Sequence, residues 1–298
     1  MTAVASQQSL PEGSVPSRAW PGHEDVLAHA AGENFPVALR LLPRADRAGL
    51  LAVYGFARLT DDLGDQWPGD RMEALDWLEA ELNAALAGRA AHPTVTAAAQ
   101  TILALGIDDQ PLRDLIEANR QDQVVHAYHS FEALVGYCRL SANPVGRLVL
   151  TIFGASTPQH EEWSDAICTG LQLAEHWQDV GEDAAAGRIY LPAEDRDRFG
   201  VGPAELLGRT SSPAMRALMA FQVARARVWL DTGTPLVGAL RGRSRLAVGG
   251  FVAGGHAALD AIAAADFDVL AATRRPSPLA FGRRLVSLAR THGGTGGR

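Results

Sequence analysis

Apolar residues recur at intervals of three and four along most of the chain, a spacing that places them on one face of an α-helix. The pattern is clearest in residues 71–86, 111–125 and 212–230. Strict alternation of β-branched residues, which would indicate half-buried strands, is scarce. The hydrophobic pattern therefore predicts an all-α protein with little strand.

Proline and glycine interrupt the apolar stretches and mark the ends of the predicted helices. Such breaks fall at residues 67–69, 88, 92–93, 106, 157–158, 199–203 and 233–235. Residues 108–111, Asp-Asp-Gln-Pro, are typical of a helix start with proline in the first turn. No shift in composition divides residues 23–273, so we expect one domain of about ten helices with its site between facing helices.

The two ends of the chain differ from this helical body. Residues 1–22 are rich in Ser, Pro, Gln and Gly and lack the apolar segment of a secretory signal, so we expect a disordered tail. Residues 274–298 form a basic tail, which we expect to be partly disordered at its end. Its arginines alternate with Leu279, Phe281 and Leu285. Such a segment can lie on an anionic membrane surface, but we favour an ordinary surface helix.

Composition narrows the class of protein. The chain has 298 residues, is 47% hydrophobic and 20% charged, and can bury a substantial core. A formal net charge of -7 argues against binding to nucleic acid. Two cysteines without a Cys-x-x-Cys spacing favour a reduced, cytoplasmic setting. The longest apolar run, residues 246–259, is shorter than the roughly 18 residues that span a bilayer, so we expect a soluble or peripheral protein.

Two pairs of aspartates interrupt the apolar pattern. Asp61 and Asp65 belong to Asp-Asp-Leu-Gly-Asp, and Asp179 and Asp183 belong to Asp-Val-Gly-Glu-Asp. Residues four apart share a helix face, so each pair directs two carboxylates the same way. Like charges at this spacing destabilise an isolated helix by roughly 0.2–0.5 kcal/mol, which calls for a compensating cation. Carboxylate oxygens suit Mg²⁺, which commonly joins carboxylates to substrate phosphates.

The second pair belongs to a longer polar stripe. Gln172, Glu175, Asp179 and Asp183 follow one another at steps of three and four residues, so one helix would place them on one face. If that face is buried, a metal or a polar ligand must satisfy it. A solvated helix face is the alternative.

An arginine accompanies each acidic array. Arg58 lies one turn before the first array, and Arg188 follows the second within Gly-Arg-Ile-Tyr-Leu-Pro at residues 187–192. A guanidinium there could hold a carboxylate or bind a diphosphate through two hydrogen bonds. Among the histidines, His126 and His129 lack an obvious third metal ligand, and His176 is expected to be packed or hydrogen-bonded.

The two acidic arrays, their order and the Gly-Arg-Ile-Tyr-Leu-Pro string resemble the squalene/phytoene synthase family over about residues 33–275. Residues 33–38 and 137–147 are similar to one branch, the hydroxysqualene synthases of bacterial hopanoid clusters. The second segment reads Tyr-Cys-Arg-Leu-Ser-Ala-Asn-Pro-Val-Gly-Arg. Squalene and phytoene synthases more usually carry Val-Ala-Gly or Val-Ala-Ser there, so this segment distinguishes the branch.

The resemblance implies an isoprenoid synthase fold and a role for each matching residue. Mg²⁺ ions that grip the substrate diphosphate would be held by Asp61, Asp65, Glu175, Asp179 and Asp183. Substrate-binding roles are implied for Phe35, Arg58, Gln172, Arg188 and Asn143. Catalytic roles near the reacting carbon or the departing diphosphate are implied for Tyr54, Tyr137 and Tyr190. The family commonly has Asn where this chain has Glu175. Glutamate is also an oxygen ligand for Mg²⁺, but it adds negative charge to the site.

The resemblance also implies a reaction. The leading hypothesis is Mg²⁺-dependent conversion of presqualene diphosphate and water to hydroxysqualene and diphosphate, in squalene and hopanoid biosynthesis. The alternative is head-to-head condensation of two farnesyl or geranylgeranyl diphosphates to presqualene diphosphate, squalene or phytoene. A catalytically inactive helical partner is a third hypothesis, against which the four intact aspartates argue. The expected partners are a prenyl diphosphate and other enzymes of the pathway, with contact at the inner membrane face left open.

Overall fold

The computed structural model describes residues 43–89, 91–271, 281, 282 and 284. The described chain is built from helices, and its only bridge between extended residues joins Ala127 and Ile189. The prediction of an all-α fold is therefore confirmed. The candidate residue Phe35 lies outside the described residues, as does the expected tail at 1–22, and so does most of the expected tail at 274–298.

The first four described helices share one hydrophobic core. They are α3 (Arg44–Asp61), α4 (Arg71–Leu86), α5 (Pro93–Leu105) and α6 (Gln110–Asp122). The apolar stripe predicted at residues 71–86 is α4, which buries Leu75, Leu78 and Leu82 completely. Burying one such side chain contributes about 1.5–3 kcal/mol, so this stripe fixes α4 against the other three helices.

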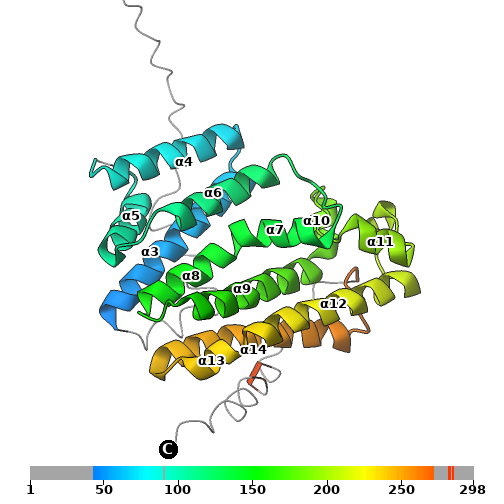
Figure 1. Cartoon of the computed structure of the whole chain (residues 1–298). Coiled ribbons are helices and arrows are strands. Elements are labelled where there is room, and N and C mark those ends of the chain that lie inside the picture. Colours follow the sequence, from blue (N-terminus) through cyan, green and yellow to red (C-terminus); the bar gives the residue numbers. More distant parts are fainter. Residues whose placement is uncertain (1–42, 90, 272–280, 283, 285–298) are drawn as a thin grey trace, which may run out of the picture.

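A second core surrounds the long helix α9 (Pro158–Gln178). In Figure 1, α9 lies between α7 (Phe131–Ser141) and α8 (Asn143–Ile152) on one side and α12 (Pro213–Gly233) on the other. Glycine allows α9 and α12 to approach closely. A Cβ atom at Gly233 would overlap the Trp163 carbonyl oxygen, and one at Gly170 would lie 2.8 Å from the Leu230 side chain. Larger residues at these two positions would separate the helices.

Short elements complete the fold. They are α10 (Val180–Ala185), α11 (Ala193–Phe199), the 3₁₀ turn η2 (Pro203–Leu207) and α13 (Pro235–Ala239). After α10, the amides of Ile189 and Ala193 donate hydrogen bonds to the carbonyls of His126 and Tyr128, at 2.8 and 2.9 Å. These bonds anchor the segment that carries Arg188.

Helix α14 (Gly242–Ala264) carries the long apolar run. Among the described residues it is the one helix long and apolar enough to cross a membrane, but 61% of its most apolar window is buried inside the protein. That degree of burial is typical of a core helix. Arg284 donates two hydrogen bonds of 2.7 Å to Asp260 of α14, and Arg227 donates a third to the same carboxylate. This arginine of the basic tail is therefore paired with the protein.

The α-helical geometry of α3 ends inside the first acidic array. Asp61 is the last residue of α3, and the π-helical turn η1 (Asp62–Gln66) follows. The predicted α-helical spacing is thus replaced by a wider turn. Single π turns of this kind occur frequently at functional sites.

Helix α6 holds the π turn in place. Gln123 Nε2 donates to the Gly64 carbonyl at 3.0 Å, and Asn119 Nδ2 donates to Asp61 Oδ1 at 3.2 Å. A Cβ atom at Gly64 would overlap the side-chain oxygen of Asn119. Glycine in the Asp-Asp-Leu-Gly-Asp string therefore lets α6 approach closely enough to hold Asp61.

Replacing Gly64 by alanine tests this packing. We expect Gly64→Ala to lower the free energy of unfolding by about 1–3 kcal/mol, because the methyl group displaces Asn119. The control is Gly136→Ala in α7, where an added Cβ meets nothing within 4 Å, and where alanine should stabilise the helix by about 1 kcal/mol. Urea denaturation of both variants measures the difference, and equal effects would contradict the packing role of Gly64.

Candidate functional site

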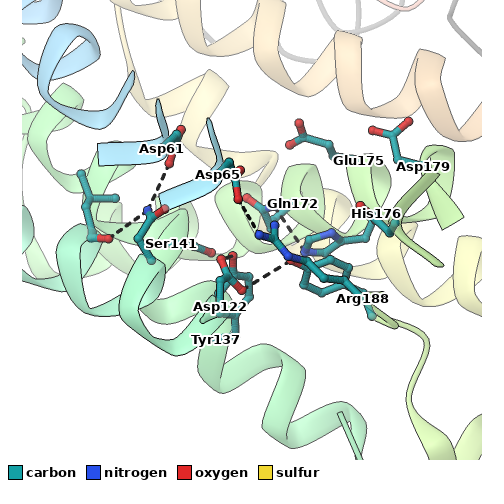
Figure 2. A pocket seen from close by; sticks show the side chains of 14 residues that line it. Asp61, Asp65, Asp122, Tyr137, Ser141, Gln172, Glu175, His176, Asp179 and Arg188 are labelled. Carbon is teal, nitrogen blue, oxygen red and sulfur yellow. Dashed lines mark hydrogen bonds and ion pairs between the residues drawn. The ribbon is translucent and has the colours of Figure 1, made fainter. Parts of the chain in front are cut away.

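Both acidic arrays face one cavity of about 250 Å³. Figure 2 shows the side chains of the two arrays directed into the same space. Nine of the thirteen residues selected from the sequence line it: Asp61, Asp65, Tyr137, Gln172, Glu175, Asp179, Asp183, Arg188 and Tyr190. The other lining residues are Leu115, Asn119, Asp122, Ser141 and His176. The structure therefore brings together residues separated by more than a hundred positions in the sequence.

The second acidic array spans a break between two helices, and the prediction of a single helix there is wrong. Helix α9 ends at Gln178, Asp179 has φ -106° and ψ 14°, and Asp183 lies in α10. The hydrogen bonds between residues four apart nevertheless continue, from the Asp179 amide to Glu175 and from the Asp183 amide to Asp179. They keep the carboxylates on one side, so the whole stripe still lines the cavity.

Among the described residues that line the cavity, Arg188 is the one with a permanent positive charge. Its Nη2 atom donates to Asp65 Oδ1 at 2.6 Å and so joins the second array's return segment to the first array. Gly187, with φ +84°, ends α10 in the left-handed conformation and turns the chain toward this contact. This ion pair connects the two walls.

Arg58 does not line the cavity. Its Nη2 atom lies 3.0 Å from Asp62 Oδ1, one turn further along the chain. The guanidinium therefore holds a neighbouring carboxylate, which is one of the two roles considered from the sequence.

Negative charge is in excess around the cavity. Six carboxylates line it, from Asp61, Asp65, Asp122, Glu175, Asp179 and Asp183. The pKa of Asp61 is raised to about 7, chiefly by burial and also by the charges of Asp65 and Glu175, while the Asn119 hydrogen bond and the Arg58 charge lower it. Burial also raises the pKa of Asp183 to about 7, with further contributions from Asp179 and Glu175. The charge of Glu175 thus raises the pKa of an aspartate in each array. A cation between the arrays would relieve the repulsion among these carboxylates.

This donor set suits Mg²⁺ shared with an anionic ligand. Within the described part of the chain, no three acidic, histidine or cysteine side chains converge closely enough to hold an ion alone. Mg²⁺ commonly uses only one or two protein carboxylates and takes its other ligands from water and substrate phosphates. Pairs of carboxylates on facing walls therefore fit metal ions that bridge the protein to a diphosphate.

Three of the four tyrosines of the chain form an aromatic cluster beside the carboxylates. The ring centroids of Tyr128, Tyr137 and Tyr190 lie 5.7–5.9 Å apart. His176 stacks on Tyr190 with a centroid distance of 3.7 Å, and its Nε2 atom lies 3.3 Å from Gln172 Nε2. Burial lowers the pKa of His176 to about 3, so its ring is neutral at physiological pH.

Asp122 orders two of these tyrosines. Tyr137 Oη donates to Asp122 Oδ2 at 2.6 Å, and Tyr190 Oη lies 3.5 Å from Asp122 Oδ1. Burial raises the pKa of Asp122 to about 6, while the Tyr137 hydrogen bond and the Arg188 charge lower it. Burial also raises the pKa of both tyrosines, which keeps the phenols protonated.

Asp122 and Asn119 were not predicted from the sequence. Both lie on α6 at positions that continue the apolar stripe of Leu112 and Leu115, and both are buried. The sequence did offer one signal, a polar residue within the apolar stripe of a helix. Such a residue indicates a buried hydrogen bond, since a buried polar group needs a partner. The partners could not be identified from the sequence because they lie on other segments of the chain.

Two further candidates lie outside the cavity wall. Asn143 is buried and its Oδ1 atom accepts a hydrogen bond from Thr169 at 3.1 Å, so it joins α8 to α9. Tyr54 lies in α3 one turn before Arg58 and is half-buried. His126 and His129 are exposed and belong to no metal-binding group among the described residues.

Ser141, the last residue of α7, also lines the cavity. Its Oγ atom is buried and has no hydrogen-bond partner among the described residues. An unpartnered buried hydroxyl costs about 1–3 kcal/mol, so this side chain stands out from the rest of the wall.

Ionisation of Asp122 should make stability depend on pH. Its pKa is about 6 in the folded protein and about 3.9 in an unfolded chain. The folded state therefore binds the extra proton, and stability falls as pH rises from about 4 to 6, by up to about 3 kcal/mol. Asp122→Asn keeps an oxygen for Tyr137 but cannot ionise.

We expect Asp122→Asn to be more stable than the natural protein by about 1–3 kcal/mol at pH 8, with little difference near pH 4.5. Thermal melting in the presence of a chelator at both pH values measures this. A variant that is less stable at pH 8 would show that the Asp122 charge stabilises the fold.

Comparison with known proteins identifies the family of the chain. Residues 28–284 match the family model for squalene/phytoene synthase. The chain is 35% identical over 213 residues to a hydroxysqualene synthase of Rhodopseudomonas palustris, covering 70% of this chain and 72% of the relative. It is 34% identical over 210 residues to a phytoene synthase of Arthrospira platensis, covering 65% and 68%.

Solved structures agree with the sequence comparison. The squalene synthase HpnC from Alicyclobacillus acidocaldarius superimposes with a TM-score of 0.77 at 41% identity, over 82% of this chain and 94% of that one. The fold and the match along most of the sequence lead to one conclusion: the chain belongs to the squalene/phytoene synthase family and has its all-α isoprenoid synthase fold.

Proposed function

We propose that the protein converts presqualene diphosphate and water to hydroxysqualene and diphosphate. The observation that carries this proposal is the pair of facing carboxylate arrays, joined by Arg188 and Asp65, beside an aromatic cluster. Members of the family act on prenyl diphosphates with divalent metal. The resemblance of residues 137–147 to the hydroxysqualene synthase branch favours this reaction over others in the family, and the chain is 35% identical to a hydroxysqualene synthase.

The carboxylates would hold Mg²⁺ against the diphosphate. Asp61 and Asp65 would supply ligands from one wall, and Glu175, Asp179 and Asp183 from the other. Bound Mg²⁺ would neutralise the negative charge that develops on the departing diphosphate. Without a cation these walls repel a diphosphate, so substrate and metal should bind together. Arg188 can donate to a diphosphate oxygen while it holds Asp65, because a guanidinium has several donors.

The aromatic cluster would accommodate the cation left when diphosphate departs. A tyrosine face stabilises a nearby cation by roughly 0.5–2 kcal/mol. Asp122 accepts a hydrogen bond from the Tyr137 hydroxyl and so fixes the orientation of the Tyr137 ring. The packed tyrosines also keep bulk water from the cation, which would otherwise be quenched at random. Gln172 would fix the neutral ring of His176 behind Tyr190.

The alternative is head-to-head condensation of two linear prenyl diphosphates. It is favoured by the 34% identity to a phytoene synthase, which nearly equals the identity to the hydroxysqualene synthase. An inactive scaffold is a weaker candidate, because all four aspartates face the cavity. We place the enzyme in the cytoplasm, where its prenyl diphosphate substrate would come from pathway enzymes and its C30 product could pass to the inner membrane face.

Product analysis with three substrates tests the proposal. Purified protein with Mg²⁺ is given presqualene, farnesyl or geranylgeranyl diphosphate in separate reactions. We expect a hydroxylated C30 alcohol from presqualene diphosphate and no product from either linear diphosphate alone. Formation of presqualene diphosphate, squalene or phytoene from a linear substrate would instead support the condensing alternative.

The acidic arrays are tested by removing charge from the second one. We expect the double variant Asp179→Asn, Asp183→Asn to lose at least about 100-fold in turnover, because metal-bound diphosphate can no longer be stabilised. Excess chelator should abolish turnover of the natural protein in the same assay. Glu182→Gln is the matched control, because this exposed residue lies between the two aspartates but not in the cavity wall. Normal turnover in the double variant would exclude the second array from catalysis.

A further inference from the structure

Ser141 is the neutral polar side chain of the cavity wall that is not engaged with the protein. Each of the others has a polar neighbour. Asn119 donates to Asp61, Tyr137 donates to Asp122, Tyr190 lies close to Asp122, and Gln172 and His176 contact each other. Ser141 Oγ has no such partner among the described residues. In Figure 2, Ser141 lies on the side of the cavity that carries Asp122, away from Glu175 and Asp179.

Several other hydroxyls on helices of this protein bond to the backbone of their own helix. Thr60, Thr101 and Thr151 donate to the carbonyl four residues earlier, at 2.8, 2.8 and 2.9 Å. Ser141 lies at the end of α7, where the same bond is common for serine, yet it makes none. Its hydroxyl can therefore turn about its one side-chain torsion toward the cavity without breaking a hydrogen bond.

The position of Ser141 in the sequence supports a role in product choice. Residues 137–147 form the segment in which the chain resembles the hydroxysqualene synthase branch. Within it Arg147 pairs with Asp165 at the surface, and Asn143 binds Thr169 between helices. Ser141 and Tyr137 are the polar residues of the segment that reach the cavity. Ser141 also lies one turn beyond Tyr137, on the same face of α7.

We propose that Ser141 holds the water molecule that ends the reaction. This inference rests on the proposed function, since only an alcohol-forming enzyme needs such a water. The serine hydroxyl accepts a hydrogen bond from the water and directs a water lone pair at the carbocation left by the departing diphosphate. A carbon–oxygen bond forms, the water loses one proton, and the released diphosphate takes that proton. Ser141 is a positioning residue in this step and gains or loses no atom.

The distribution of products tests the role of Ser141. With presqualene diphosphate and Mg²⁺, we expect Ser141→Ala to release diphosphate within about threefold of the natural rate, since ionisation does not need the hydroxyl. The fraction of alcohol should fall by about tenfold, and hydrocarbons formed by proton loss should replace it. Ser141→Thr keeps a hydroxyl and should keep the alcohol. Ser164→Ala, a buried serine outside the cavity wall, is the matched control.

Each outcome bears on one proposal or both. If the natural protein makes no alcohol, the proposed function and this inference both fail. If it makes alcohol and Ser141→Ala makes the same fraction, only this inference fails. Thermal melting distinguishes a structural role, because removal of an unpartnered hydroxyl should not lower the melting temperature. A Ser141→Ala protein that is unfolded, or that releases no diphosphate, would also overturn the inference.

Discussion

Repulsion among the carboxylates of one cavity is the constraint on which the structure of the site depends. Two hydrophobic cores, one around α3 to α6 and one around α9, hold like charges near each other. Within the described cavity wall a single guanidinium, Arg188, offsets them by binding Asp65 across the gap. The free energy that this repulsion costs is offset by the burial of apolar side chains in the two cores. Such local conflicts are common at sites that bind a cationic or metal-bound ligand.

Much of the fold could be predicted because it depends on local pattern. The apolar stripes gave the helix at residues 71–86, and the proline in the first turn marked the start of α6. The spacing of the acids likewise indicated which carboxylates would share a side. What the pattern could not show was the geometry of each array. The π turn after Asp61 depends on Asn119 and Gln123, which contact it from a helix more than fifty residues away.

The same limit explains the residues that were missed or misplaced. Asp122 matters because Tyr137 and Tyr190 converge on it, and that convergence requires three segments to meet. Asn143 lies in the segment whose resemblance suggested the hydroxysqualene synthase branch, yet its side chain faces Thr169 between helices. Resemblance to a family can suggest which segment matters, whereas packing decides which of its side chains reaches the cavity.

The glycine-mediated contact between α9 and α12 has a mechanical consequence. Because Gly170 and Gly233 allow the two helices to lock together, the wall that carries Glu175 has little freedom to shift. The opposite wall ends in a π turn held by two side-chain hydrogen bonds. Close packing of Gly64 against Asn119 braces that wall as well. Both walls of the cavity are therefore held by glycine contacts, and packing sets the separation of the two arrays before any ligand binds.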